Sequence, residues 1–310
     1  MVSRNAAETT PLADAKSTSA AESSTATVLL LCVKYGADKE TEKYLESVRG
    51  LRGQQNLQVL VVDNMVDSSP ARWLARHNCA TIHAPENLGY FGGGRYGLSH
   101  YLRQNPLPDW IIVSNVDLAI ADPDFLLHLA SLSRFPRLGA VAPRIRSALT
   151  GRDQNPFMRV RPSPIRMHVY KWLFRSWLVL NTYELASAAV HKARGAVRRL
   201  TGIVVSRGAS SRQTIYAPHG SFLILSKNYF ARGGDLEFPE FLFGEEIYIA
   251  ESMKNLGLEV LYEPSLEVLH NEHRSTNLLK SRKMAAYVAA AAAYCADKFF
   301  PLTSRTASSR

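Results

Sequence analysis

The regular alternation of short apolar runs with amphipathic segments constrains the fold of this chain more than any other feature. Runs that suit buried strands occupy residues 27–33, 57–63, 79–84, 110–117, 139–145, 214–226, 259–262 and 266–270. Helical patterns fall at residues 38–51, 71–77, 123–133, 245–256 and 277–299, and one more is expected to end near Arg103. Strands that alternate with helices predict an α/β fold, in which helices flank a mainly parallel sheet.

Composition divides the chain into three parts. Residues 1–26 are mostly Ala, Ser, Thr and Glu, lack the apolar centre of a signal peptide, and are expected to be disordered. Residues 27–275 form the predicted domain, with a basic helical insertion at about 151–212, and residues 276–310 form a helix and a tail. Because no apolar window is long enough to span a bilayer, we expect a cytoplasmic protein that can bind peripherally at the inner face of the plasma membrane.

The charge of the chain indicates an anionic partner. The formal net charge is +10 and the pI is about 9.6, which suits nucleic acid, anionic lipid headgroups or a phosphorylated substrate. The cysteines Cys32, Cys79 and Cys295 are scattered and form no C-x-x-C pair. This pattern favours a reducing compartment and no disulfide framework.

Polar side chains follow two of the predicted strands at the point where each strand ends. Asp63 and Asn64 end one run, and Asn115 and Asp117 end another. Ligands of open α/β sheets gather outside the carboxyl ends of the strands. A carboxylate two residues from another oxygen ligand suits a divalent cation that holds a diphosphate. At Asp63, hydrogen bonding to a base or ribose competes with an ordinary capped turn.

A glycine-rich segment, Asn87–Gly97, lies between a predicted strand and a helix. Gly92, Gly94 and Gly97 satisfy G-x-G-x-x-G, and Asp117 follows 20 residues later, which is the spacing of a dinucleotide-binding fingerprint. Two other interpretations of these glycines are therefore open: the cofactor-binding loop of a dehydrogenase, and a tight turn that leads into a helix. The segment lies far from its strand and after two strand–helix units, so we favour a loop whose backbone approaches a nucleotide-sugar.

Two further positions carry candidate chemistry. Glu245 and Glu246 begin a predicted helix, where the helix dipole alone favours acids, but a carboxylate there could also take a proton from a hydroxyl. His270 closes the last strand-like run and has no zinc-site spacing, so only its company with Asp117 suggests a metal role.

Taken together, these motifs resemble those of the family 2 glycosyltransferases, especially the bacterial rhamnosyltransferase-like branch that builds surface polysaccharides. The resemblance covers residues 27–270 outside the basic insertion. It rests on Tyr35, VVDN with Asp63, NLGYFGGGRYG, SNVD, APHGSFLILSKNYF, FLFGEEI and YEPSLEVLH, in that order.

This resemblance implies a GT-A fold, a dTDP- or UDP-sugar donor, and Mg²⁺ or Mn²⁺ held by Asp117 and His270. It places Glu246 at the catalytic base, with Glu245 beside it, and it places His219, Gly220 and Phe243 on the acceptor side. The donor contacts that it implies are Tyr35, Asp63, Asn64, Asn87, Gly89, Gly93, Gly94, Arg95, Asn115 and Asp117.

The chain departs from the family pattern at three of these positions. Glu246 stands where the family has Asp, and Asn115 replaces the first Asp of the metal motif. Arg95 stands where Asn is common, and its charge could offset that of a diphosphate. The base can therefore be displaced, or Glu245 can share its role, and the resemblance implies metal dependence less strongly.

The resemblance implies an inverting glycosyltransferase that acts on a glycan or polyprenyl-linked acceptor in O-antigen or capsule synthesis. The alternatives are a nucleotide-dependent dehydrogenase and a degenerate, non-catalytic GT-A protein bound to the membrane. Asn115 and Glu246 keep the second alternative open, because both alter catalytic positions of the family.

The segment 157–200 is rich in Arg, Lys and aromatic residues. We expect it to bind an anionic membrane surface rather than nucleic acid, with an apolar helix face made of Trp172, Leu173, Trp177 and Leu180. Basic residues such as Arg175 would reach the headgroups. A solvated helical subdomain that closes over the acceptor site is the alternative.

Overall fold

The computed structural model describes residues 26–66, 77, 79–186, 211–271 and 280–302. The predicted disordered tail lies outside these residues apart from Ala26. The predicted helix at 71–77 lies outside them apart from His77, and so do residues 187–200 of the basic segment.

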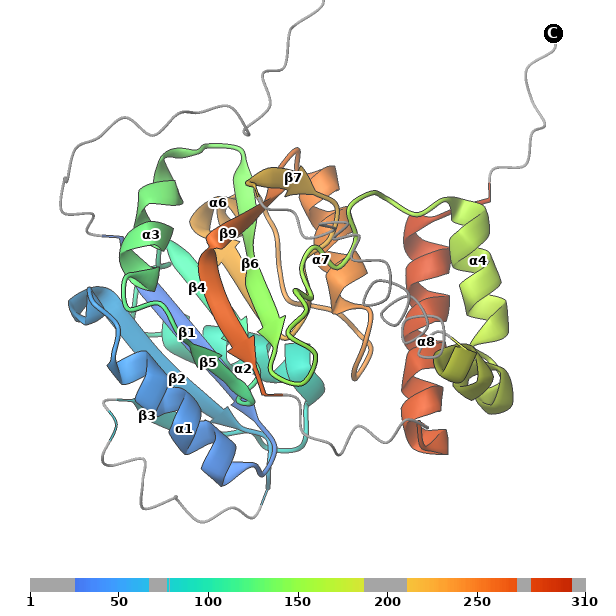
Figure 1. Cartoon of the computed structure of the whole chain (residues 1–310), viewed down its shortest axis with the longest axis horizontal. Helices are drawn as coiled ribbons and strands as arrows, with labels where there is room; N and C mark the ends of the chain where they lie inside the picture. Colours follow the sequence, from blue (N-terminus) through green and yellow to red (C-terminus); the bar gives the residue numbers. More distant parts are fainter. Residues whose placement is uncertain (1–25, 67–76, 78, 187–210, 272–279, 303–310) are drawn as a thin grey trace, which may run out of the picture.

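The described strands form a nine-stranded mixed sheet, in the order β3-β2-β1-β4-β8-β6-β9-β5, with β7 paired to β9 (Figure 1). Neighbours are parallel from β3 to β4 and between β6 and β9, whereas β8 runs antiparallel to both β4 and β6. The strands are β1 (Val28–Lys34), β2 (Leu57–Asp63), β3 (Ala80–His83), β4 (Trp110–Ser114), β5 (Leu118–Ile120), β6 (Leu138–Ser147), β7 (Gln213–Ile215), β8 (Phe222–Ser226) and β9 (Glu259–His270).

Helices cover both faces of the sheet because the central strands are apolar on both sides. All seven residues of β1 are buried, and successive residues join opposite clusters. One face packs against α1 (Asp38–Arg49) and α3 (Phe125–Ser131). The other packs against α2 (Gly89–Leu102), α7 (Glu245–Asn255) and α8 (Arg282–Phe299). The remaining α-helices with defined bounds are α4 (Pro164–Leu173) and α6 (Lys227–Ala231).

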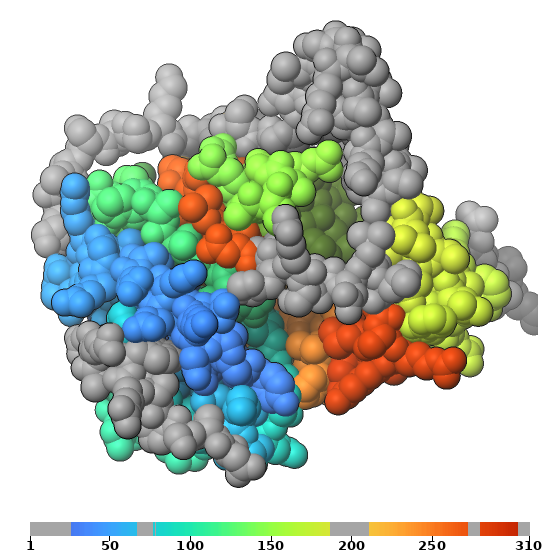
Figure 2. Space-filling view, turned by 60° about the horizontal axis from the view of Figure 1, so that its bottom comes forward, coloured from blue at the N-terminus to red at the C-terminus, as the bar shows by residue number. Residues whose placement is uncertain are grey.

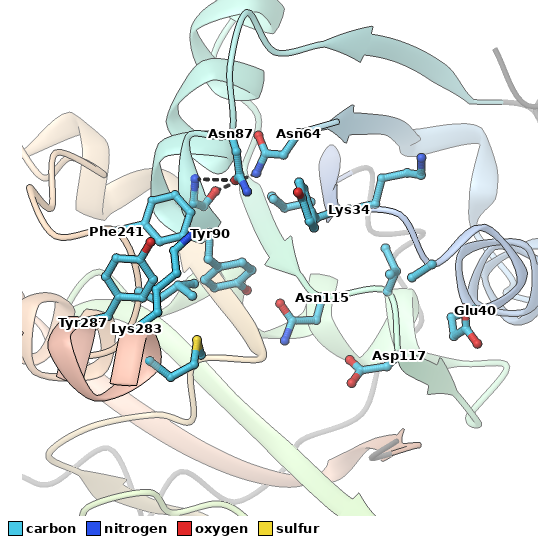
Figure 3. A pocket seen from close by; sticks show the side chains of 17 residues that line it. Lys34, Glu40, Asn64, Asn87, Tyr90, Asn115, Asp117, Phe241, Lys283 and Tyr287 are labelled. Carbon is cyan, nitrogen blue, oxygen red and sulfur yellow. Dashed lines mark hydrogen bonds between the residues drawn. The ribbon is translucent and has the colours of Figure 1, made fainter. Parts of the chain in front are cut away.

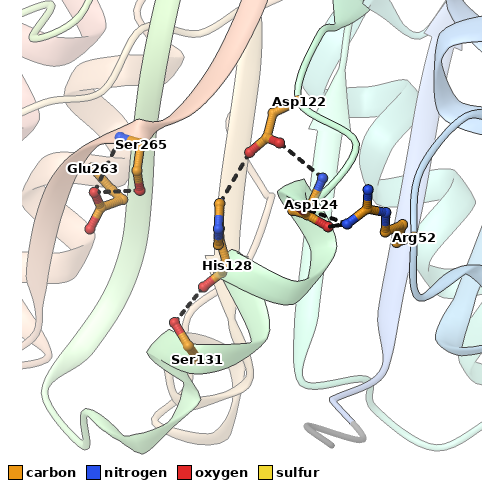
Figure 4. Close-up of polar contacts among 7 residues, drawn as sticks. All are labelled: Arg52, Asp122, Asp124, His128, Ser131, Glu263 and Ser265. Carbon is orange, nitrogen blue, oxygen red and sulfur yellow. Dashed lines mark hydrogen bonds and ion pairs between the residues drawn. The ribbon is translucent and has the colours of Figure 1, made fainter. Parts of the chain in front are cut away.

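Polar contacts fix the start of α3 beside the loop that follows α1 (Figure 4). The Asp122 carboxylate accepts a hydrogen bond from the Asp124 backbone N–H at 2.9 Å and lies 3.1 Å from His128 Nδ1. Arg52 donates to the Asp124 carboxylate at 2.9 Å. These contacts occupy donors and acceptors at the helix start, which otherwise lack intrahelical partners.

The predicted glycine-rich loop is wrong, because Gly89–Leu102 is a helix. A Cβ at Gly93 would lie 2.7 Å from Val33 Cγ1, and one at Gly97 would lie 2.7 Å from Val62 Cγ2. A Cβ at Gly94 would lie 3.0 Å from Val113. The glycines therefore let α2 approach the sheet closely, which is a packing role and not a backbone cradle for a ligand.

Two other expectations are corrected. The two runs predicted near the C-terminus are one continuous strand, β9, whose pairing with β6 shifts register between Pro143 and Arg144. The predicted strand 110–117 ends at Ser114, and a short strand, β5, follows it. Asn115 and Asp117 consequently stand in the connection between two strands.

From Pro164 onward the described part of the basic segment is mostly helical, as expected, and lies beside α8 at one end of the molecule (Figures 1 and 2). Its predicted apolar outer face is wrong. Leu180 is buried, and Trp177 donates from Nε1 to the Lys280 carbonyl oxygen at 2.7 Å. Among the described residues, no helix is both long and apolar enough to cross a membrane.

Candidate functional site

A cavity of about 490 Å³ opens at the carboxyl ends of β1, β2 and β4 (Figure 3). Its walls come from the strand ends, from the start of α2, from the loop before α7 and from α8. The lining residues are Val33, Lys34, Tyr35, Ala37, Glu40, Asn64, Asn87, Gly89, Tyr90, Asn115, Val116, Asp117, Phe241, Leu242, Lys283, Met284 and Tyr287. Of the ten predicted donor contacts, six line it: Tyr35, Asn64, Asn87, Gly89, Asn115 and Asp117.

Asp63 does not line the cavity, and its buried carboxylate instead holds Lys34. Lys34 Nζ lies 2.6 Å from Asp63 Oδ2 and 3.0 Å from Asp38 Oδ1. Parallel pairing of β1 and β2 sets the first contact, because Lys34 and Asp63 are register partners. No pattern in the sequence indicates this role for Lys34, since a lysine after an apolar run usually marks a strand end at the surface.

A small polar network shapes the wall nearest α2. Asn64 Nδ2 donates to the Gly89 carbonyl oxygen at 2.8 Å, and the Gly89 N–H donates to Asn87 Oδ1 at 3.1 Å. Gly89 has φ +73, and a Cβ there would lie 2.1 Å from the Phe241 carbonyl oxygen. Only glycine suits this position, where the start of α2 meets the loop before α7.

Gly93, Gly94 and Arg95 do not line the cavity. The two glycines face the sheet, and the exposed Arg95 guanidinium lies 3.7 Å from the Glu237 carboxylate. Arg95 is thus paired with an acid on a different part of the surface.

Asp117 and His270 meet because β5 pairs antiparallel with the end of β9. His270 Nε2 lies 3.3 Å from Asp117 Oδ2, and His270 Nδ1 lies 2.7 Å from Gln154 Oε1. The amide oxygen can only accept, so Nδ1 donates to it, and a neutral ring then turns the Nε2 lone pair toward the carboxylate. Either a proton on Nε2 or a cation bound by both groups satisfies this contact.

A second observation at Asp117 agrees with cation binding. Its Oδ1 atom is buried, and among the described residues it has no hydrogen-bond partner. A carboxylate and an imidazole, with the amide oxygen of Asn115 on the same connection, suit Mn²⁺ or Mg²⁺. The described residues contain no cluster of three or more His, Cys, Asp and Glu side chains, so this donor set is sparse.

The acceptor-side residues lie next to this corner. The Asn115 backbone N–H donates to the Ser221 carbonyl oxygen at 2.9 Å, which joins the end of β4 to the start of β8. The rings of His219 and His270 are 6.1 Å apart. Burial, with a smaller contribution from His270, lowers the pKa of His219 to about 4, so its ring is neutral at neutral pH.

Glu246, in the first turn of α7, contacts the residues just before β8. Its Oε1 atom accepts a hydrogen bond from the Gly220 N–H at 3.2 Å, and burial raises its pKa. Burial, together with the charge of Glu246, raises the pKa of the neighbouring Glu245 to about 8. Burial therefore disfavours the ionised form of both carboxyl groups. A carboxylate with a raised pKa accepts a proton more readily, which suits a catalytic base.

Tyr90 lines the cavity and lies within electrostatic range of both groups of carboxylates. Its hydroxyl donates to the Val113 carbonyl oxygen at 2.8 Å. Burial raises the pKa of this hydroxyl first, and the charges of Glu245, Glu246 and Asp117 raise it further. The charges of the predicted base and of the predicted metal ligand thus both act on one side chain of the cavity wall.

The C-terminal helix α8 completes the site, which the sequence did not predict. Lys283, Met284 and Tyr287 line the cavity, and the rings of Tyr287 and Phe241 are 4.8 Å apart. Phe243, predicted on the acceptor side, has φ +70 and lies under Lys280 Nζ, which is 5.5 Å from the ring centroid. It does not line the cavity.

The chain is similar to known glycosyltransferases. No protein-family model matches it. It is 24% identical to the N-acetylglucosaminyl-diphospho-decaprenol L-rhamnosyltransferase of Mycobacterium tuberculosis, over 87% of this chain and 84% of that protein.

Two solved structures are also similar. GalNAc-T7 with UDP, GalNAc and Mn²⁺ matches with a TM-score of 0.50 at 12% identity, over 79% of this chain and 43% of that one. The Pyrobaculum calidifontis mannosyltransferase PcManGT with GDP-Man and Mn²⁺ matches with a TM-score of 0.47 at 14% identity, over 81% of this chain and 58% of that one. The chain thus spans about half the length of these two structures, and the expected GT-A fold is confirmed.

Proposed function

We propose that this chain, a glycosyltransferase of the GT-A fold and a distant homologue of the mycobacterial L-rhamnosyltransferase, moves a hexose from a dTDP- or UDP-sugar to a polyprenyl-linked glycan. L-rhamnose is the sugar that this homology favours. The single observation that carries the proposal is the cavity at the carboxyl strand ends, which Asn115 and Asp117 line. The Gly220–Glu246 hydrogen bond lies outside this lining, just before the neighbouring strand β8. Surface polysaccharide synthesis is the setting that such an acceptor implies.

The reaction is a single displacement with inversion. The acceptor hydroxyl oxygen bonds to the anomeric carbon while the bond from that carbon to the phosphate oxygen breaks, and the nucleoside diphosphate leaves from the opposite face. Glu246 takes the hydroxyl proton. Its hydrogen bond to the Gly220 N–H holds the other end of the carboxyl group in place.

Asp117 and His270 would hold a divalent cation, with Asn115 as a neutral third ligand. Such an ion, when bound, supplies positive charge to the leaving phosphate. Asn64 and Asn87 offer amide groups to the donor, and the exposed Tyr35 ring offers an apolar surface at the mouth of the cavity.

A panel of nucleotide-sugars, with released nucleoside diphosphate as the readout, tests this function. We expect release with a dTDP- or UDP-sugar, and Glu246→Gln should lower it about a hundredfold or more with the fold intact. Glu46→Gln on the exposed face of α1 is the matched control. A greater loss in Glu245→Gln would move the base to Glu245, and thermal stabilisation by NAD(H) or NADP(H) alone would replace the transferase with a dehydrogenase.

We also propose that the helical end of the molecule binds an anionic membrane surface, with a different apolar face from the one expected. Ile165, Val169 and Trp172 follow the spacing i, i+4, i+7 on α4, and Ile165 and Trp172 are 71% and 70% exposed. Leu178, 65% exposed, lies on the next helix, and the exposed Arg175 lines a shallow depression together with Trp172. Each basic residue contributes about 1 kcal/mol at an anionic surface, and buried apolar side chains add to this.

Co-sedimentation with vesicles of anionic or neutral phospholipid tests the membrane surface. We expect binding to anionic vesicles that salt weakens, and Ile165→Ser with Trp172→Ser should lower it about tenfold or more. Leu127→Ser removes an exposed apolar side chain from α3 and should leave binding unchanged. Equal binding by both variants, or binding to a nucleic acid instead of vesicles, would reject this surface.

A further inference from the structure

Two lysines line the cavity, and they differ in whether a carboxylate already pairs with the ammonium group. The Lys34 ammonium is buried between two carboxylates, 2.6 Å from Asp63 and 3.0 Å from Asp38. Lys283 comes from α8 and forms no ion pair with any described residue. Figure 3 shows Lys283 beside Phe241 and Tyr287, with its side chain extending along the cavity wall.

The neighbours of Lys283 along the chain are committed to other contacts. Lys280 Nζ lies 5.5 Å from the centroid of the Phe243 ring, and the Arg282 guanidinium lies 5.7 Å from that of the Trp177 ring. Lys283 Nζ is 6.0 Å from the centroid of the Tyr287 ring, which itself lines the cavity. Among the cations at the start of α8, Lys283 is thus the one placed at the cavity.

The orientation of α8 is fixed by packing on the catalytic side. Cys295 Sγ contacts the Gly244 carbonyl oxygen at 3.8 Å, directly before Glu245, and Ala291, Cys295 and Phe300 belong to the core. The rings of Tyr287 and Phe241 stack at an interplanar angle of 33°. The helix that carries Lys283 is therefore held against the loop that leads into the acidic pair of α7.

We propose that Lys283 binds the diphosphate of the sugar-nucleotide donor and neutralises part of the charge that develops on it as it leaves. The proposal rests on the proposed function and adds a binding residue from the C-terminal helix. Lysine acts as a compact point charge toward phosphate. The diphosphate carries negative charge that a cation must balance. Asn115 contributes no charge toward a metal and Arg95 is paired with Glu237, so a lysine at the cavity is a suitable source of that positive charge.

Calorimetric titration of the full chain with UDP, UMP and uridine, and with dTDP, dTMP and thymidine, tests this role. Each series is measured with and without Mn²⁺. We expect Lys283→Gln to weaken binding of the preferred diphosphate about tenfold or more, the usual scale of a charge-assisted contact. Nucleoside binding should not change, and Lys283→Arg should retain most of the affinity. The loss should be larger without Mn²⁺, because Lys283 is then the one cation of the described cavity lining that is not paired with a carboxylate.

Lys298→Gln is the matched control, because Lys298 lies on the same helix but outside the cavity. Equal diphosphate affinity in Lys283→Gln and Lys298→Gln would overturn the role of Lys283 while leaving the proposed function intact. Equal loss of diphosphate and nucleoside affinity would show a structural effect and would also overturn it. If the unaltered chain binds no nucleoside diphosphate, both proposals fail together.

Discussion

Two adjacent carboxyl groups share the first turn of α7, and their ionisation links the site to stability. Burial and the charge of Glu246 raise the pKa of Glu245 from 4.5 to about 8. The folded protein thus binds a proton that the unfolded chain releases. Stability from this group is fully present below a pH of about 4.5 and is lost as the pH rises through about 8.

We therefore expect Glu245→Gln to flatten the dependence of stability on pH. The free energy of unfolding, measured by urea titration, should fall between about pH 5 and about pH 8.5 in the unaltered chain and fall less in the variant. Glu46→Gln removes an exposed carboxylate from α1 and should preserve the original slope. An identical slope in Glu245→Gln would mean that Glu245 is ionised in the folded protein at neutral pH.

Individual site residues differ in how far the sequence could predict them. Asn115 and Asp117 were predictable because a polar triplet after a continuous apolar run marks the carboxyl end of a strand. Lys34 and Tyr90 were not, because their roles depend on partners in other elements, Asp63 on β2 and the carbonyl of Val113 on β4. The roles proposed for the predicted residues stay predictions until they are tested on the protein.

At the scale of elements, α2 shows how packing overrides a local glycine signal. Three glycines in G-x-G-x-x-G order read as a turn, since glycine is a poor helix former. The helix forms nonetheless, because its glycine face lies directly on β1, β2 and β4. The strand-rich half of the chain was predictable from its apolar runs, whereas this helix and the uninterrupted β9 depended on contacts between distant segments.

We expect Gly97→Ala to destabilise the protein, although alanine favours helices. The added Cβ would lie 2.7 Å from Val62 Cγ2 and 3.1 Å from Leu31 Cδ2, both on buried strands that cannot move aside. Overpacking of this kind costs about 1–3 kcal/mol, against a propensity gain of about 1 kcal/mol. Urea unfolding of Gly97→Ala should show a net loss, and Ser99→Ala on the exposed face of α2 should show none. A higher free energy of unfolding in Gly97→Ala would mean that α2 can move away from the sheet without loss of stability.

At the scale of the whole molecule, distant segments meet behind the cavity at one buried acid. Glu251 of α7 accepts hydrogen bonds from Arg161 Nε at 2.6 Å and from the Tyr216 hydroxyl at 2.7 Å. Arg161 also donates to the Phe299 carbonyl oxygen at 2.7 Å and lies 4.1 Å from the centroid of the Phe300 ring. The start of the insertion, α7 and the end of α8 are thereby joined at one point, which no local pattern in the sequence could indicate.

Arg161→Met should therefore loosen the molecule as a whole. Glu251 is 3% exposed, so the variant would leave a buried carboxylate without its cation, a change that costs about 3–5 kcal/mol when both partners are buried. Because the Arg161 side chain is 32% exposed, solvent screening should reduce the loss to about 2 kcal/mol in urea unfolding. Arg166→Met on the exposed face of α4 should cost less than about 0.5 kcal/mol. If Arg161 also positions α8, Arg161→Met alone should weaken diphosphate binding. In a double variant with Lys283→Gln it should then add little to the loss that Lys283→Gln already causes. Additive losses in the double variant would instead mean that Arg161 affects binding independently of Lys283, and no loss of binding in Arg161→Met would assign Arg161 to stability alone.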